Sequence, residues 1–386
     1  MSVRAVTNLA RSSITLASTR RLGVTSTLSL CNFTRTTTNT LQSLVAVHKK
    51  PQHSQQRRTM ATTTSATTTT APVPFRTHSP QPDAAPSTPL THVFFHVPTS
   101  TWTYLVVDPS TRKAAAVDSV LDFDPQSNSV STETADGLLA FARQQRIEIV
   151  KILETHAHAD HLTGAAYLQH QLAAAAAPGT TGAVVPIGAY SSIRETQAHF
   201  AKLYDVPMTE LEGAFDELYD EGSEIEIGDL KGQVWHLPGH TECSAGYVFG
   251  DAVYTGDSVL LPSIGSARVD FPAGSASRLF ASSQRLLSLP PHVRLFSGHH
   301  YAASPTFEGG NRCSATVGEQ RELNKHFKEG VASQEFVRMR EERDRELNEP
   351  RLLHQSLQVN IRAGRLPKGQ DGRSYLRLPI KAPAGI

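Results

Sequence analysis

The sequence has no long hydrophobic run and little cysteine, and both absences exclude classes of protein. No apolar stretch in the 386 residues approaches the roughly 18 residues that a membrane-spanning helix requires, so we expect no membrane span. Cys31, Cys243 and Cys313 are widely separated and include no CxxC pair, which excludes a disulfide framework and a cysteine zinc site. This usage is typical of a reducing compartment. Cys243 and Cys313 are more typical of small buried apolar side chains than of reactive thiols.

An overall charge imbalance is also missing, because 37 basic side chains stand against 36 acidic ones. The chain therefore has no large positive net charge that would attract nucleic acid. Acidic residues are, however, entirely absent from residues 1–82, which are rich in arginine, serine and threonine. This composition is typical of a mitochondrial transit peptide. It predicts a presequence over residues 1–60 and a location in the mitochondrial matrix, and a low-complexity tail without a targeting role is the alternative.

Residues 61–90 are predicted to form a disordered linker. Threonine dominates residues 62–70 and proline is frequent in residues 72–89, and neither composition can bury a core. Met60 directly precedes this segment and could serve as an internal start, which would give a cytosolic form. We expect the folded sequence to begin near Thr91.

The remaining sequence predicts layers of strands and helices. Aromatic and β-branched runs at residues 92–97 and 102–107 are bounded by turn residues and predict strands. Helical patterns fall between and after such runs, which is typical of a sandwich of sheets with helices outside. The charged stretch 316–348 is expected to be helical, with a solvated face at residues 341–346.

Candidate metal ligands are concentrated in one short segment. The apolar run at residues 147–153 predicts a buried strand, and the ligands follow directly on the loop that leaves it. The segment reads Thr155-His156-Ala157-His158-Ala159-Asp160-His161. Imidazole and carboxylate groups together suit a divalent transition metal.

Three further candidate ligands recur in the same setting. His240, Asp257 and His299 each follow a predicted strand, and each stands directly after a glycine. Glycine lets the backbone turn sharply, so that each side chain can point into a shared site. A single Gly-His or Gly-Asp is a weak signal, because it is usually a turn. Four strand-end clusters together predict one metal site.

The order THxHxDH, GH, GD and a late GH resembles the metallo-β-lactamase superfamily. The resemblance implies an α/β fold, an αββα sandwich with its site at one edge between the sheets. It assigns residues 91–305 to the catalytic domain and residues 306–386 to a helical C-terminal extension. In that family the motifs can hold two metals. One metal site would use His156, His158, His240 and Asp257, and the other Asp160, His161, Asp257 and His299.

Two branches of this superfamily are compatible with these motifs. Glyoxalase II-like thioester hydrolases use both metal sites, for which two Zn(II) are expected. Persulfide dioxygenases of the mitochondrial and bacterial type hold a single Fe(II) through the equivalents of His156, His240 and Asp257. Residues 266–272 resemble the Arg-x-Asp-Phe segment of the dioxygenases, and residues 358–367 resemble the tail of a bacterial subgroup tied to persulfide oxidation. Both features favour the dioxygenase branch.

The resemblance therefore predicts an Fe(II)-dependent persulfide dioxygenase with one iron per chain. It would convert glutathione persulfide and O2 to sulfite and glutathione, as part of mitochondrial sulfide oxidation. A dinuclear hydrolase of glutathione thioesters is the alternative. In the dioxygenase the remaining ligand-type residues would orient the iron ligands and move protons, or would only hold the loop together. These residues are His158, Asp160, His161 and His299.

Two residues are candidates for substrate binding. Arg268 would clamp a glutathione carboxylate, since a planar guanidinium suits bidentate pairing, but a salt bridge to Asp270 is an equal alternative. Tyr301 would donate a hydrogen bond near the metal, or would simply pack. His300 departs from the family, which usually has an acidic residue there, and Ser263-Ile264 replaces a frequent Asp-Tyr. The sequence is compatible with a homo-oligomer and does not determine the oligomeric state.

Overall fold

The computed structural model describes residues 76–175, 184–301 and 312–383 of the chain. They all belong to the second of two units, Thr67–Ile386. The predicted presequence and the first part of the predicted linker lie outside the described residues. Within the described part of the chain, no helix combines the length and the apolar character that a bilayer span requires.

The first large sheet is mixed and has seven strands among the described residues. β2, β3 and β4 pair antiparallel, whereas β4, β7, β9 and β10 pair in parallel. In spatial order the strands are β1 (Arg76–His78), β2 (Leu90–His96), β3 (Thr101–Val107), β4 (Lys113–Val117), β7 (Glu148–Leu153), β9 (Ile187–Tyr190) and β10 (Glu217–Tyr219).

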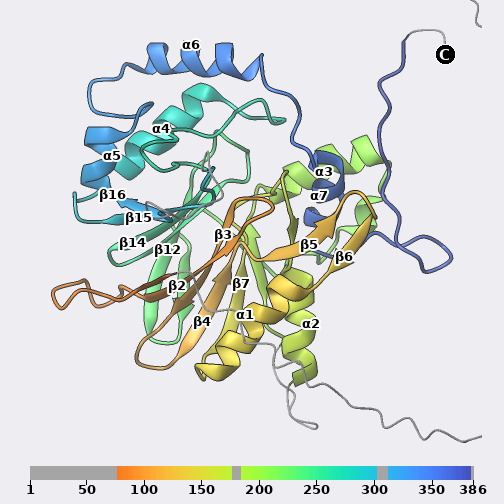
Figure 1. The fold of residues 1–386 in the computed structure, drawn as a ribbon, viewed down its shortest axis with the longest axis horizontal. Helices are drawn as coiled ribbons and strands as arrows, with labels where there is room; N and C mark the ends of the chain where they lie inside the picture. The colour runs from red at the N-terminus through yellow and green to blue at the C-terminus, as the bar shows by residue number, and fades with distance from the viewer. Residues whose placement is uncertain (1–75, 176–183, 302–311, 384–386) are drawn as a thin grey trace, which may run out of the picture. The chain divides into compact units, whose positions relative to one another are not determined.

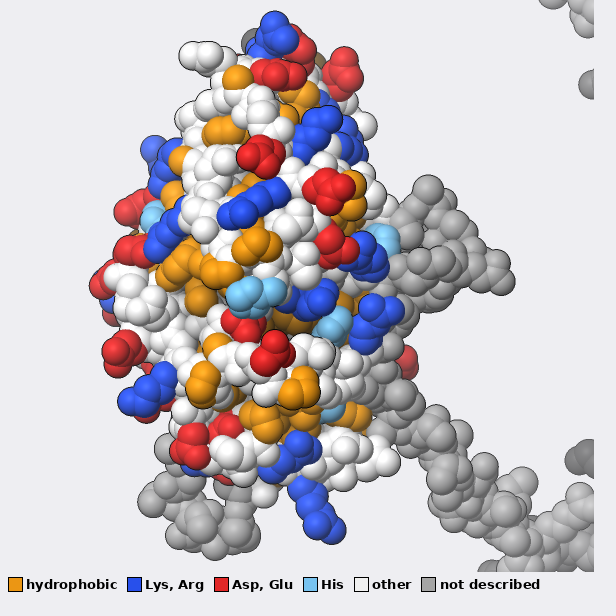
Figure 2. All heavy atoms as spheres, turned by 90° about the vertical axis from the view of Figure 1, so that its left-hand side faces the viewer, with side chains coloured by type: hydrophobic (Ala, Val, Ile, Leu, Met, Phe, Trp, Pro, Cys, Tyr) orange, Lys and Arg blue, Asp and Glu red, His pale blue; other side chains and the backbone are white. Residues whose placement is uncertain are grey.

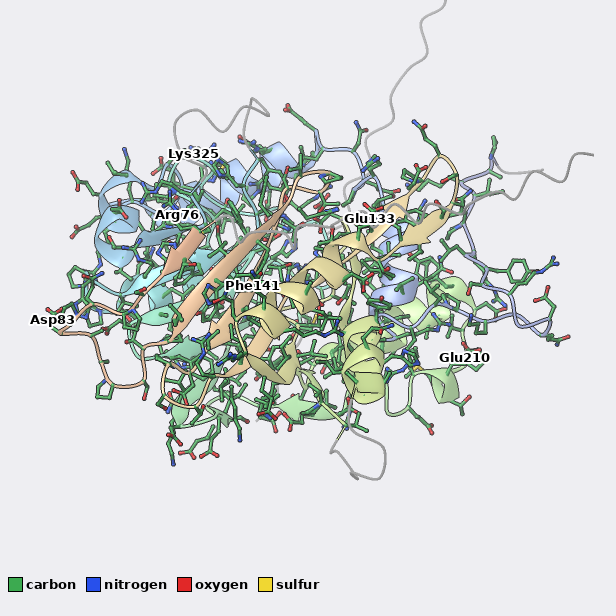
Figure 3. The ribbon with its side chains drawn as sticks, turned by 60° about the horizontal axis from the view of Figure 1, so that its bottom comes forward. Arg76, Asp83, Glu133, Phe141, Glu210 and Lys325 are labelled. Carbon is green, nitrogen blue, oxygen red and sulfur yellow. The ribbon has the colours of Figure 1, made fainter. Side chains whose placement is uncertain are left out.

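β1 lies inside the segment that the sequence assigned to the linker. It pairs antiparallel with β2, with Arg76 opposite Val93 and His78 opposite Thr91, and Figure 3 shows Arg76 on this strand. The folded chain therefore starts earlier than Thr91. The composition did not predict this strand. A short edge strand is held by main-chain hydrogen bonds, so its sequence needs no hydrophobic pattern.

The second large sheet has six strands in the described chain. β14 and β15 pair in parallel, and its other neighbouring strands pair antiparallel. Its strands are β11 (Glu224–Ile227), β12 (Leu230–His236), β13 (Ala245–Phe249), β14 (Ala252–Gly256), β15 (Arg294–Ser297) and β16 (Ser314–Thr316). A small sheet is formed by β6 (Ser129–Ser131), β5 (Val120–Asp124) and β8 (Leu162–Thr163).

The two large sheets share one apolar layer. Tyr104 and Val106 of β3 belong to the same buried cluster as Val234 of β12 and Tyr247 of β13. Alternate residues of a strand point to opposite faces, so each sheet also has an outer face to cover. This layer is the sheet-on-sheet core of a sandwich.

Helices cover the outer faces of both sheets (Figure 1). On the first sheet, Phe141 of α1, labelled in Figure 3, contacts Phe94 of β2 edge to face. Their ring centroids are 5.4 Å apart. On the second, Leu279 and Phe336 share a buried cluster with Leu295 of β15. The predicted αββα sandwich is confirmed. The helices are α1 (Glu133–Gln144), α2 (Ala165–Ala175), α3 (Ile193–Tyr204), α4 (Ala276–Leu287), α5 (Val317–Leu323), α6 (Ser333–Asp344) and α7 (Leu353–Asn360).

The charged stretch 316–348, which was expected to be helical, contains the two helices α5 and α6. α5 begins with a capping box between Thr316 and Glu319, and α6 follows after a break. The expected solvated face at residues 341–346 is exposed except for Asp344, which is buried, as is Arg340 one turn earlier. These two exceptions matter for the metal centre.

Acidic and basic side chains are interspersed over the face drawn in Figure 2. Ion pairs also join separate parts of the described chain, and among them Arg278 pairs with Glu242 and Arg285 with Glu221.

Candidate metal centre

The predicted ligand residues meet at one edge of the sandwich, on loops that leave β7, β12, β14 and β15. The ligand atoms of His156, His240 and Asp257 all lie within 4.8 Å of one another. Those of His158, Asp160 and His161 form a second group of the same size. The structure thus gathers both sets, and the role of each residue as a metal ligand stays a prediction.

His299 lies between the two groups. Its Nε2 is 3.4 Å from Asp160 Oδ2 and 3.5 Å from Asp257 Oδ2. Tyr301 stacks on its ring, with centroids 5.2 Å apart. Neighbouring His300 is half-buried, its ring centroid 6.4 Å from that of Trp102, and it belongs to neither group.

Glycine is required beside two of these ligands because neighbouring atoms leave no room for a Cβ. A Cβ at Gly298 would lie 2.6 Å from Asp257 Oδ1. A Cβ at Gly256, whose φ is +49°, would lie 2.3 Å from the Thr155 hydroxyl. The predicted role of the Gly-His and Gly-Asp pairs therefore has a steric reason as well as a conformational one.

Several buried polar atoms at this edge have no hydrogen-bond partner. Buried polar atoms are paired in the great majority of cases, so a cluster of exceptions calls for an explanation. Imidazole nitrogens and carboxylate oxygens that converge without partners suit a bound transition metal. The donor set therefore fits a metal ion. The atoms are His158 Nδ1, Asp160 Oδ2, His161 Nε2, Asp257 Oδ1 and His299 Nε2.

Hydrogen bonds on the far side of the rings set the histidine tautomers. His240 Nδ1 donates to the carbonyl of Arg268 (2.7 Å), His161 Nδ1 to that of Leu162 (3.1 Å), and His299 Nδ1 to that of Ser100 (3.2 Å). A carbonyl can only accept, so Nδ1 carries the proton and the lone pair of Nε2 faces the site.

Asp118, at the end of β4, organises the motif loop and was not predicted. It accepts hydrogen bonds from the Thr155 amide (2.8 Å), the Thr155 hydroxyl (2.8 Å) and His158 Nε2 (3.1 Å). Because that hydroxyl donates to Asp118, it accepts from His156 Nδ1 (3.0 Å), which leaves His156 Nε2 free. A carboxylate directly after a strand was the signal that could have identified Asp118.

The site favours positive charge at His158. Burial alone would lower its pKa, but Asp118 and Glu154 raise the pKa of His158 well above its usual range. In contrast, burial and the neighbouring His158 and His240 hold the pKa of His156 well below its usual range. The carboxylates of Asp118 and Glu154 thus favour positive charge at this edge of the sandwich.

Asn360, the last residue of α7, ties the C-terminal extension to the motif loop. Its Nδ2 donates to the carbonyls of His158 (2.7 Å) and His161 (2.8 Å), and its Oδ1 accepts from the Thr163 amide (2.8 Å). Cys243 supports the same loop, since its buried sulfur accepts from the Ala157 amide at 3.4 Å. Cys243 therefore behaves as a small buried side chain.

A cavity of about 450 Å³ opens from the metal centre. Asp160, His240 and Asp257 line it together with Arg343 and Arg351. Neither arginine forms an ion pair with any acidic residue in the part of the chain that the structure describes. The cavity therefore offers two unpaired cationic side chains.

Arg268 also lines this cavity, but its guanidinium is engaged. Nε and Nη2 donate to Asp270 at 2.6 and 2.5 Å, and Nη1 donates to the carbonyl of Asn348 at 2.9 Å. The salt bridge that the sequence offered as an alternative is thus present. A substrate role for Arg268 or Tyr301, which also lines the cavity, stays a prediction.

The fold and the site together define a metal-binding member of one superfamily. The sequence model of the metallo-beta-lactamase superfamily matches residues 97–299, and the chain belongs to this family. The chain is 40% identical over 300 residues to a beta-lactamase hydrolase-like protein of Xylella fastidiosa, covering 77% of this chain and 66% of that relative. It is 39% identical to glyoxylase B2 of Dictyostelium discoideum, covering 75% of this chain and 96% of the relative.

More distant similarity extends to both predicted branches. The crystal structure of ETHE1 from Myxococcus xanthus superposes with a TM-score of 0.54 at 26% identity, covering 71% of this chain and 99% of that one. Mitochondrial persulfide dioxygenase ETHE1 of Bos taurus is 25% identical, covering 70% of this chain and 87% of the relative. A hydroxyacylglutathione hydrolase of Vibrio cholerae is 30% identical over 45% of this chain and 57% of its own length.

Proposed function

We propose that the chain is an iron-dependent persulfide dioxygenase that acts on glutathione persulfide. The observation that carries the proposal is the convergence of His156, His240 and Asp257 within 4.8 Å. Two histidines and one carboxylate on one side of an ion are the ligand set of non-haem Fe(II) oxygenases. The similarity to persulfide dioxygenase ETHE1 and to the ETHE1 structure supports it.

The overall reaction is balanced with water as a reactant. Glutathione persulfide, O2 and water give glutathione, sulfite and two protons, so the sulfane sulfur is oxidised and O2 is reduced. The bond between the two sulfur atoms breaks, and the proximal sulfur leaves as the thiol. When bound, Fe(II) would supply the redox chemistry that joins O2 to the sulfane sulfur.

The residues of the chain have three tasks in this reaction. His156, His240 and Asp257 would hold the ion, and far-side hydrogen bonds set the tautomers of the two histidines. Arg343 and Arg351 would bind the carboxylates of the glutathione moiety, because both line the cavity and neither forms an ion pair with a described acidic residue. In this function His158, Asp160, His161 and His299 would orient ligands and carry protons.

Metal content and two assays test the proposal. The protein is purified anaerobically and its metals are quantified. O2 consumption with glutathione persulfide is then compared with hydrolysis of S-lactoylglutathione. We expect one iron per chain and O2 uptake. Two zinc ions per chain with thioester hydrolysis and no O2 uptake would overturn the proposal.

A dinuclear glutathione-thioester hydrolase is the second candidate, because one observation favours it. His158, Asp160 and His161 form their own group of converging ligand atoms, as a second metal would need. The relatives named beta-lactamase hydrolase-like protein and glyoxylase B2 point the same way. The experiment above separates the two candidates.

We also propose a mitochondrial location, which the acid-poor composition of residues 1–60 supports. Fusion of residues 1–60 to a fluorescent protein tests it, with a fusion in which the arginines of that segment are replaced by glutamine as the control. Mitochondrial import of the first fusion alone is expected. A cytosolic first fusion would contradict the proposal.

A further inference from the structure

We infer that helix α6 of the C-terminal extension is a positioning element for His240. The helix does not touch His240 itself. It acts through residues 266–270, here called the bridging segment, which lie between the helix and the metal centre. The inference rests on the proposed role of His240 as a metal ligand, and it holds for iron and for zinc alike.

The bridging segment determines how His240 presents its ligand atom. The carbonyl of Arg268 accepts the Nδ1 proton of His240 at 2.7 Å. This bond fixes the ring tautomer and orientation, so that Nε2 lies 3.7 Å from Asp257 Oδ2. A shift of this carbonyl would therefore turn or misplace one of the three proposed metal ligands.

The bridging segment has no strand or helix to hold it, because residues 265–270 carry no regular secondary structure. His326 accepts from the Ser266 amide at 2.9 Å, and α6 supplies the further support. Asp344 Oδ2 accepts from the Val269 amide at 2.8 Å, directly beside the carbonyl that His240 uses. Arg340 Nη1 donates to the Ser266 hydroxyl at 3.3 Å. The helix thus fixes the segment on both sides of Arg268.

The support is an ion pair that is itself buried. Arg340 and Asp344 are 2% and 7% exposed, and Arg340 Nη2 donates to Asp344 Oδ1 at 2.5 Å. A buried ion pair is a poor means of gaining stability, because desolvation offsets its attraction. Arg340 also borders the cavity and keeps one nitrogen, Nε, without a hydrogen bond. A role in positioning the bridging segment explains why this ion pair is present although its desolvation is unfavourable.

α6 is anchored independently of this pair. Phe336 packs on Phe327 and Phe280, with ring centroids 4.9 and 5.4 Å apart. These aromatic contacts hold the helix on α4 and on the segment before α6. Removal of the ion pair should therefore release the bridging segment without detaching the helix.

The test measures metal binding by the full chain without any turnover. In the double variant Arg340→Met/Asp344→Leu both charges are replaced by apolar side chains, an exchange that is often neutral for folding. The matched control is Glu341→Leu/Arg345→Met, which removes the exposed pair of the same spacing on the same helix. The double variant Arg340→Met/Asp344→Asn keeps an amide oxygen that can accept from Val269.

Dissociation constants for Zn²⁺ and Co²⁺ are measured by chelator competition, together with the Co²⁺ absorption spectrum and the Tm of the metal-free protein. We expect the first variant to bind about 10–100-fold more weakly with an altered spectrum and a nearly unchanged Tm. The control should match the wild type, and the asparagine variant should recover most of the affinity. If the first variant does not fold, Arg340→Met/Asp344→Ser, whose hydroxyl is too short to reach Val269, takes its place.

Wild-type affinity and spectrum in the first variant would overturn the inference. So would an equal loss of affinity in the control variant, since the effect would then not come from the bridging segment. A wild-type chain that binds neither ion would instead overturn the proposed metal site, and the inference with it.

Discussion

At the scale of single residues, each histidine of the site presents one nitrogen because its other nitrogen is already hydrogen bonded. The sequence predicted which residues converge, since strand ends followed by Gly-His or Gly-Asp place side chains at one edge. It did not predict the bonding partners of these residues. The partners of His240 and His299 are the backbone carbonyls of Arg268 and Ser100. Every residue has such a carbonyl, so the sequence does not show which one a histidine will contact.

Asp118→Asn should weaken metal binding about 10–100-fold. The change removes the charge to which the Thr155 hydroxyl and His158 are hydrogen bonded. Because the Thr155 hydroxyl is also bonded to His156, the His156 ring should lose its fixed orientation. Metal titration by chelator competition measures the effect. Asp124→Asn, which alters an exposed carboxylate on β5, is the control. Equal affinity in the two variants would show that Asp118 does not organise the ligands.

Asp160→Asn separates the two candidate functions. In a mononuclear dioxygenase the variant should keep one iron per chain and turn over more slowly, because Asp160 belongs to the second group of ligand atoms. In a dinuclear hydrolase it should lose the second metal and most of its activity. Metal stoichiometry and turnover are measured on the same preparation. Complete loss of iron would contradict the assignment of the iron ligands.

At the scale of elements, the predicted strands and the sandwich follow from hydrophobic patterns, whereas the C-terminal extension shows where patterns fail. The charged sequence predicted a solvated helix face at residues 341–346, yet Asp344 within it is buried, and so is Arg340 just before it. Asp344 bonds to Val269, which is 75 residues away along the chain. No local periodicity can reveal a partner at that separation, so the burial of these two residues could not be predicted from the sequence.

The end of α6 and the segment after it should determine substrate affinity. Arg343→Gln and Arg351→Gln are each expected to raise KM for glutathione persulfide about tenfold, with kcat changed little, because each removes a charge-assisted contact. Arg338→Gln, on the same helix but outside the cavity lining, is the control. Steady-state kinetics give both constants. A fall in kcat at constant KM would indicate a structural effect instead.

At the scale of the whole molecule, buried histidines make the fold sensitive to acid. Burial, with smaller contributions from nearby cations, lowers the pKa values of His78, His92 and His326 from 6.5 to about 4. Each of these groups is neutral in the folded protein, while the unfolded chain takes up protons first as the pH falls. The stability that they contribute is present above about pH 6.5 and is lost as the pH falls toward 4.

The free energy of unfolding of the metal-free protein should therefore decrease between pH 7 and pH 5, as urea titrations can measure. His92→Gln should reduce this decrease, since it removes one of the three groups. His199→Gln, at an exposed position on α3, should leave it unchanged. A pH dependence identical in the two variants would contradict the assignment to buried histidines.

The contact between Asn360 and the loop that carries His158 and His161 has a consequence for biosynthesis. A ribosome releases the N-terminal ligands long before it makes the helix that ties them in place. We expect the nascent chain to be unable to retain a metal ion until Asn360 has been made. Capture of the metal would then follow the synthesis of α7, and a chain truncated before α7 should bind the ion weakly.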